Sequence, residues 1–265
     1  MSLEKHVNNS GFPLQLGLAH KIKSTASEHG WKVLYQEHSW KNVSEGGFID
    51  LVLEDRYRTW LMNIECKRVL DTSWIFIVPP GKYSKHRHCK LWISCLSDKN
   101  LKCFNWVDIP VDPETYQAQF CVIPGQDKKA RPMLERTAAA VVSSTEALAV
   151  EEASVLSEKY SNLRIYTNVI VTTANLKVCR VDPNKVDLVD GTLKEFLFED
   201  VPFLRFRKQL SYNAVVNKED SKEDSIRSLI SQKENTVFIV QASEFIKFLK
   251  DIELPDNVRP YIENR

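Results

Sequence analysis

The segment that most constrains the fold of this 265-residue chain is residues 46–69, in which two apolar runs are separated by six mostly polar residues. The runs cover residues 48–53 and 60–64, and both are short and rich in branched or aromatic side chains. This pattern predicts two β-strands joined by a turn. Each strand carries an acid where a buried strand rarely has one, because Asp50 lies inside the first run and Glu65 directly follows the second.

Strand geometry brings the charged residues of this segment together. Side chains alternate between the two faces of a strand, so Glu65 and Lys67 share one face and Cys66 takes the other. Antiparallel pairing of the two strands places Asp50 opposite Glu65. Two carboxylates on one surface are costly to bury unless a cation neutralises them. Mg²⁺ prefers oxygen ligands, and we expect them from Asp50, Glu65 and the main-chain carbonyl of Cys66. Lys67 would orient or deprotonate a water molecule, or stabilise a developing negative charge.

Asp50 followed by Glu65-Cys66-Lys67 on the next strand resembles the active-site motif of the PD-(D/E)XK nuclease superfamily, which has the restriction-endonuclease-like fold. The resemblance covers residues 12–69. It implies a hydrolase that uses Mg²⁺ or Mn²⁺ to cleave phosphodiester bonds in DNA, in a restriction or defence setting. It also implies that Asp50, Glu65 and Lys67 are catalytic, and that a homodimer is an option. Many members have a Glu in the first helix, where this chain has Gln15, and Ile49 replaces the family's proline.

Two other interpretations stay open, because an acid-x-Lys triplet occurs by chance in a chain this charged. Another such triplet is present at residues 127–129. The protein could keep the nuclease-like fold without the reaction and serve as a nucleic-acid-binding or interaction module, which the missing carboxylate at Gln15 favours. It could also be an unrelated α/β protein in which the charges of Asp50, Glu65 and Lys67 form a solvated cluster.

The segments before the motif contain two further polar residues of interest. Apolar residues recur every four positions from Leu14 and predict a helix from residue 12 to about residue 28. Gln15 lies one step off this apolar stripe, where it either reaches the site from the helix edge or is solvated. Residues 31–40 predict a strand, and Glu37 within it either faces the same site or, as we prefer, is a plain surface charge.

The most basic segment of the chain, residues 82–90, follows the motif closely. Lysine and arginine near a metal site can hold phosphates and position a nucleic-acid backbone. An exposed loop that balances charge is an equal alternative. The candidate nucleic-acid-binding residues are Lys82, Lys85, Arg87 and Lys90.

Composition sets the remaining expectations. The net charge is +1, so that no overall field attracts nucleic acid and any affinity must come from local patches. No apolar run approaches the roughly 18 residues of a membrane span, and the N-terminus lacks the apolar centre of a signal peptide, which predicts a cytoplasmic protein without a membrane partner.

We expect one α/β domain with a mixed central β-sheet flanked by helices. Its restriction-endonuclease-like core would cover residues 12–130, and a C-terminal half of unknown role, residues 131–255, would extend it. Residues 1–11 and 256–265 are expected to be flexible tails.

Overall fold

The computed structural model describes most of the chain, with gaps at its two ends and in five internal segments. The described residues are 2–81, 84–97, 100–126, 131–154, 163–211 and 233–256, without the side chains at 96, 97 and 100–103. Two expected features therefore lie outside the described residues, namely Lys82 and all but the first residue of the C-terminal tail.

Three helices begin the chain, α1 (Leu3–Asn9), α2 (Phe12–Ser24) and α3 (Ala26–His29). The expected tail thus contains a helix: the Ser2 side chain accepts a hydrogen bond from the Lys5 N–H and caps α1, although α1 has no buried residue. Gly30, with φ of 78°, ends α3 in the left-handed conformation that glycine adopts without strain.

The motif residues lie in β2 (Gly46–Glu54) and β3 (Trp60–Lys67). The neighbouring strands are β1 (Lys32–Lys41) and β8 (Leu163–Thr172). The strands β1, β2 and β3 form an antiparallel meander, and β8 pairs parallel to β3. The two strands predicted around the charged hexapeptide are confirmed as β2 and β3. Asp55 makes the turn between them, because its carboxylate accepts hydrogen bonds from the main-chain N–H groups of Thr59 and Trp60.

The large sheet continues beyond β8 through four more strands, in the order β1-β2-β3-β8-β12-β11-β6-β5. The added strands are β12 (Glu234–Gln241), β11 (Phe203–Gln209), β6 (Asn100–Ala118) and β5 (Lys85–Ser97). Because β5 also pairs with β8, the last five strands close into a barrel, which the sequence did not lead us to expect.

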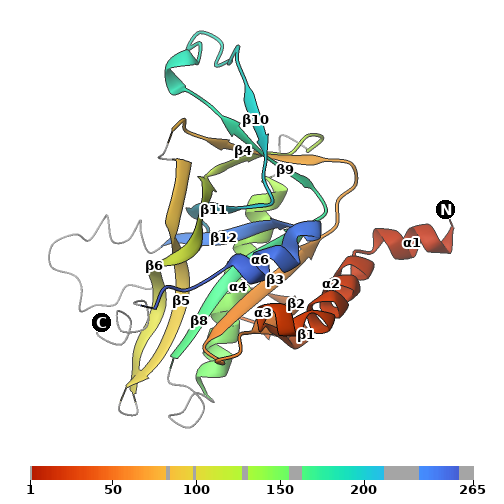
Figure 1. The fold of residues 1–265 in the computed structure, drawn as a ribbon, viewed down its shortest axis with the longest axis vertical. Coiled ribbons are helices and arrows are strands. Elements are labelled where there is room, and N and C mark those ends of the chain that lie inside the picture. Colours follow the sequence, from red (N-terminus) through yellow and green to blue (C-terminus); the bar gives the residue numbers. More distant parts are fainter. Residues whose placement is uncertain are drawn as a thin grey trace.

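A second, four-stranded sheet lies beside the barrel and is seen at the top of Figure 1. Its order is β10 (Leu197–Asp200), β9 (Asn175–Arg180), β4 (Ser73–Val78) and β7 (Phe120–Val122). The strands β4 and β9 follow directly after β3 and β8, so that this small sheet continues from the ends of the motif strands. The short helical turn η2 (Pro183–Lys185) lies in the long β9–β10 connection.

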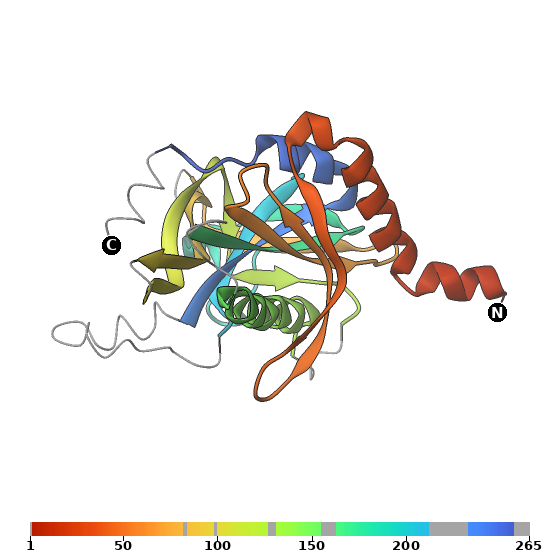
Figure 2. The ribbon, with the colours of Figure 1, turned by 90° about the horizontal axis from the view of Figure 1, so that it is seen from below.

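Helices cover both faces of the meander (Figure 2). The helix α2 and the C-terminal pair η4 (Ala242–Glu244) and α6 (Phe245–Asp251) lie on one side, and α4 (Met133–Ala153) lies on the other. Neighbouring residues of β2 accordingly enter different cores: Leu51 packs with the α2 and α6 side chains, and Val52 with those of α4. A strand buried on both faces needs a continuous apolar run, which is the pattern of residues 51–53.

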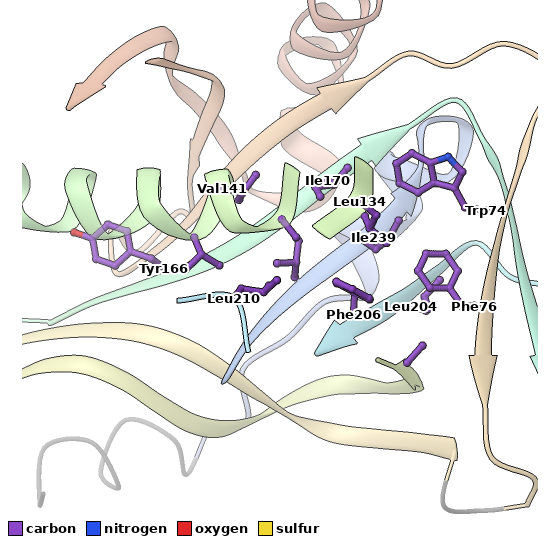
Figure 3. Close-up of a cluster of buried hydrophobic side chains, with 14 of the residues drawn as sticks. Trp74, Phe76, Leu134, Val141, Tyr166, Ile170, Leu204, Phe206, Leu210 and Ile239 are labelled. Carbon is purple, nitrogen blue, oxygen red and sulfur yellow. The ribbon is translucent and has the colours of Figure 1, made fainter. Parts of the chain in front are cut away.

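The core beneath α4 joins the two sheets. Figure 3 shows Trp74 and Phe76 of the small sheet close to Leu134 of α4 and to Ile170 and Phe206 of the large sheet. Each of these five side chains is at most 1% exposed. The small sheet is thereby held firmly against the barrel through its inner face.

The expectation of a mixed α/β fold is confirmed, with more strand than helix. The segment after Pro132 forms the long helix α4, and the apolar run at residues 169–171 lies in the central strand β8. Among the described residues, no helix is both long enough and apolar enough to cross a bilayer.

Candidate active site

The motif acids meet where β2 and β3 stop pairing. The last paired residues of this ladder are Leu51 and Ile64, so Asp50 and Glu65 face each other one step beyond it. In place of a further main-chain bond, the Asp50 carboxylate accepts a hydrogen bond through Oδ2 from the Cys66 N–H, at 2.6 Å. Asp50 is thus held by the main chain of the strand that carries Glu65.

Glu65 and Lys67 lie together on one face of β3, as the alternation of strand side chains predicts. Lys67 Nζ lies 3.3 Å from Glu65 Oε1, and both side chains are about one-third exposed, at 34% and 27%. The ammonium and the carboxylate therefore form a water-accessible pair at the strand end, where a ligand can reach both groups.

Gln15 reaches the site from α2. Its helix buries Leu18 and Ile22 against the meander, and Gln15, one step off that stripe, is only 8% exposed. Its Nε2 group donates a hydrogen bond to the main-chain oxygen of Asp50 at 3.0 Å and another to Glu37 Oε1 at 2.5 Å. Of the two placements considered for Gln15, the structure therefore has the one that reaches the site.

Glu37 is exposed, as the surface-charge interpretation expects, and it also borders the site, because its carboxylate accepts a hydrogen bond from Gln15. The β1–β2 register pairs Gln36 with Leu51 and His38 with Ile49, which places Glu37 opposite Asp50. Its φ of 50° lies in the left-handed region that residues other than glycine seldom occupy. Such strained conformations concentrate at functional sites. In the sequence, the sign of this contact is an acid inside the strand that precedes the motif strands. The left-handed conformation of Glu37 has no sign in the sequence.

The electrostatics of the site are dominated by Asp50. Burial raises the pKa of its carboxyl from 3.8 to about 6, and the negative charge of Glu65 is the next largest cause. The charge of Glu37 also raises this pKa, whereas the Cys66 N–H and Lys67 lower it. Burial likewise raises the pKa of the Cys66 thiol, so that Cys66 stays neutral near pH 7. The cluster therefore has an excess of negative charge that favours a cation or a proton.

No protein-family model, curated protein or solved structure matches this chain.

The carboxylates of Asp50 and Glu65 suit a divalent cation, which would need further ligands besides these two side chains. In the described parts of the chain, no three His, Cys, Asp or Glu side chains are grouped as a metal site. A cation held by Asp50 and Glu65 would complete its shell with water and main-chain oxygens. Mg²⁺ commonly binds in this way, through one or two carboxylates and several waters. The raised pKa of Asp50 is consistent with an uncompensated charge at this position.

The basic segment expected near the site lies elsewhere. Its residues 85–90 form the start of β5, and β8 separates β5 from β3 in the sheet. Arg87 is paired with Asp112, with Nη2 and Oδ2 2.5 Å apart, and Lys90 is 8% exposed. Lys85 lies over the Tyr116 ring, 4.9 Å from its centroid. These contacts give Arg87 and Lys85 local partners, and binding of nucleic acid by this segment stays a prediction.

Proposed function

We propose that this protein is a metal-dependent nuclease of the PD-(D/E)XK superfamily that hydrolyses phosphodiester bonds in DNA. The observation that carries the proposal is the convergence of Asp50, Glu65 and Lys67 at the ends of two adjacent strands, with the Asp50 carboxylate bonded to the Cys66 main chain. A solvated charge cluster would not require a carboxyl group with a pKa near 6 or a strained residue, Glu37, at its border.

The order of elements supports the same assignment. The resemblance implies a helix, a strand with an acid inside it and a next strand that ends in E-x-K. The corresponding elements are α2, β2 and β3, and the sheet that contains them has α2 on one face and α4 on the other. The barrel and the small sheet are then additions to a restriction-endonuclease-like core.

The chemistry assigned to the site begins with the two acids. Asp50 and Glu65 would hold a Mg²⁺ or Mn²⁺ ion, which polarises the scissile phosphate and lowers the pKa of a bound water. Asp50 must lose its proton before it can bind the cation, so a pKa near 6 leaves it ready to bind at neutral pH.

Lys67 and Gln15 have distinct expected roles. The Lys67 ammonium, about one-third exposed, can approach the phosphate and stabilise the negative charge that develops on it. Gln15 is a positioning residue, because its amide ties Glu37 and the main chain of Asp50 to α2. With Gln15 at this position, the site has one carboxylate fewer than the sites of superfamily members that have an acid in the first helix.

The test measures cleavage of supercoiled plasmid and of single-stranded DNA with Mg²⁺ or Mn²⁺. We expect cleavage by the wild type and a loss of about 100-fold or more in Asp50→Asn, Glu65→Gln and Lys67→Gln. The control is Glu45→Gln, which removes an exposed carboxylate at the β1–β2 turn and should retain full activity. Equal activity of all variants would contradict the assignment of the site.

The second candidate is a nuclease-fold protein that binds nucleic acid without cleaving it, which Gln15 in place of a carboxylate favours. Calorimetric titration with Mn²⁺ separates the candidates. Binding of Mn²⁺ by the wild type but not by Asp50→Asn, together with no cleavage of any DNA or RNA substrate, would support the second candidate over the first.

A further inference from the structure

The outer face of the small sheet carries exposed phenylalanines, although Cys179 on the same face is only 3% exposed. Its inner face, with Trp74 and Phe76, is buried in the core. Phe120 and Phe198 lie on the opposite face, because both belong to the same cross-strand row as Ile77 and Cys179. Phe120 is 60% and Phe198 49% exposed, and Phe196 stacks on Phe198 with the ring centroids 6.0 Å apart. Exposed apolar patches of this kind mark interaction sites.

The connection between β9 and β10 projects from this sheet as an arm (Figure 1). Leu188 and Val189 form the tip and are 92% and 96% exposed. The tip is built rather than loose: Asp187 Oδ1 accepts from the Val189 N–H at 2.9 Å, and the Asp187 main-chain oxygen accepts from the Gly191 N–H at 2.7 Å. These bonds shape the main chain of the turn and place two adjacent apolar side chains in water at its end.

The same sheet contains a pocket that suits such a tip. It has a volume of about 480 Å³ and lies at the β3–β4 end of the outer face. Its apolar lining is Ile75, Pro124 and Phe198, and its polar lining is Asp71, Thr72, Ser73 and Lys177. An apolar cavity of about 150 Å³ already accepts a benzene ring, so this pocket has room for both tip side chains.

We propose that the outer face of the small sheet is the interface of a two-fold dimer, in which the Leu188–Val189 tip of each copy enters the pocket of the other. A two-fold interface must be self-complementary, because residue i of one copy meets residue j of the second and the reverse. A projecting apolar tip and an apolar pocket on the same small sheet meet this requirement. The face contains none of the proposed catalytic residues, so the inference does not rest on the proposed function.

The exposed apolar area is close to what a dimer needs. A stable interface buries about 800 Å² per partner, of which roughly 500 Å² is apolar in homodimers. The phenylalanines at 120, 196 and 198, which are 60%, 56% and 49% exposed, offer roughly 250–400 Å² together. Leu188 and Val189 add nearly two whole side chains.

The charge of the arm argues against nucleic acid as the ligand of this face. Residues 182–200 contain six acids and two lysines, a net charge of −4, which repels phosphates. The nearby cations Lys177 and Lys208 are already paired with Asp200 and Glu135. Repulsion between the two acidic arms is screened beyond about 8 Å at physiological ionic strength. An apolar interface between acidic arms should therefore tighten as salt is added.

Sedimentation velocity over a range of concentrations tests the proposal with the full chain. We expect a reversible dimer of twice 30.6 kDa that strengthens with salt. The double variant Leu188→Asp/Val189→Asp should be a monomer, and it should fold normally because both positions are exposed. Val43→Asp at the fully exposed β1–β2 turn is the matched control and should stay dimeric.

Mixing the tip variant with a pocket variant tests most directly whether the tip of one copy binds the pocket of the other. Phe198→Asp spoils the pocket and should also be a monomer, but a mixture of the tip variant with the pocket variant retains one intact tip-in-pocket contact. We expect weak heterodimers in the mixture and none in either variant alone. A monomeric wild type, a dimer that survives the tip substitution, or dissociation by high salt would each overturn the proposal. The proposal would also be overturned if the tip variant stayed dimeric and lost the binding of a single-stranded oligonucleotide instead.

Discussion

The Oδ2 atom of Asp50 accepts a hydrogen bond from the Cys66 N–H at 2.6 Å, across the point where β2 and β3 separate. This bond orients the carboxylate, yet it does not offset the burial and the neighbouring charge that raise its pKa. The ionised form of Asp50 is therefore destabilised in the folded protein near pH 7. A ligand that neutralises the charge should stabilise the fold as well as bind.

Replacing Asp50 with Asn should make the protein more stable at pH 8. Asn keeps an acceptor for the Cys66 N–H and removes the buried charge. A pKa raised from 3.8 to about 6 corresponds to about 3 kcal/mol at most, so we expect a gain of about 1–3 kcal/mol in the free energy of unfolding. Urea denaturation of Asp50→Asn and wild type at pH 8 measures it, and a less stable variant would contradict the account.

The same gain should disappear in acid. Between pH 3.8 and about 6 the folded protein keeps a proton on Asp50 that the unfolded chain has lost, so this contribution to stability is complete below the window and is lost as the pH rises through it. The two proteins should therefore be equally stable near pH 4. A difference that does not change between pH 4 and pH 8 would show that the Asp50 charge is not its cause.

Activity should depend jointly on pH and metal. Mg²⁺ and a proton compete for Asp50, so at limiting Mg²⁺ we expect cleavage to rise as the pH increases through about 6. Raising the Mg²⁺ concentration should move this rising part, or limb, of the pH–activity profile to lower pH. The measurement is an initial-rate profile at several Mg²⁺ concentrations, and a limb that stays in place would argue against Asp50 as a metal ligand.

Gln15→Glu should weaken the metal-free fold and strengthen its response to metal. A carboxylate cannot donate to Glu37 or to the Asp50 main chain, and it adds a third negative charge beside them, which should cost about 1–3 kcal/mol. Thermal unfolding with and without Mn²⁺ measures this, and we expect a larger metal-induced shift than in wild type. The control is Leu16→Glu, which adds the same charge at a 65% exposed position of α2.

Arg205 should be far more important for stability than Arg207, two residues along β11. The Arg205 side chain is fully buried, with Nε 3.0 Å from Cys89 Sγ and Nη2 2.6 Å from the Val111 main-chain oxygen. Arg205→Ala should cost about 3–5 kcal/mol, because it leaves buried acceptors without a donor. Arg207→Ala, which breaks partly exposed pairs with Asp108 and Glu234, should cost about 1 kcal/mol. Urea denaturation of both variants compares them.

These contacts also show where sequence reasoning stopped. By its charge the stretch 205–208 is typical of the outer face of a helix or strand, but Arg205 is fully buried and donates to main-chain oxygens of β6. Its apolar neighbours Leu204 and Phe206 are buried on the other face of β11. A strand buried on both faces has no polar side, and only the position of β6 explains why an arginine is accommodated there.

The sequence by itself determined the local elements of the site. Side-chain alternation fixed Glu65 and Lys67 on one face, the apolar runs fixed β2 and β3, and the four-residue repeat fixed α2 with Gln15 at its edge. These depend on periods of two and 3.6 residues within one segment, so they can be read without knowing what the segment packs against.

Only the tertiary structure decided what depends on distant pairing. It brought Glu37 opposite Asp50 in a strained conformation, separated the basic start of β5 from β3, and closed five strands into a barrel. It also left the outer face of the small sheet uncovered. Each of these follows from which strands pair and in what register, and such contacts join residues far apart in the chain that share no local pattern.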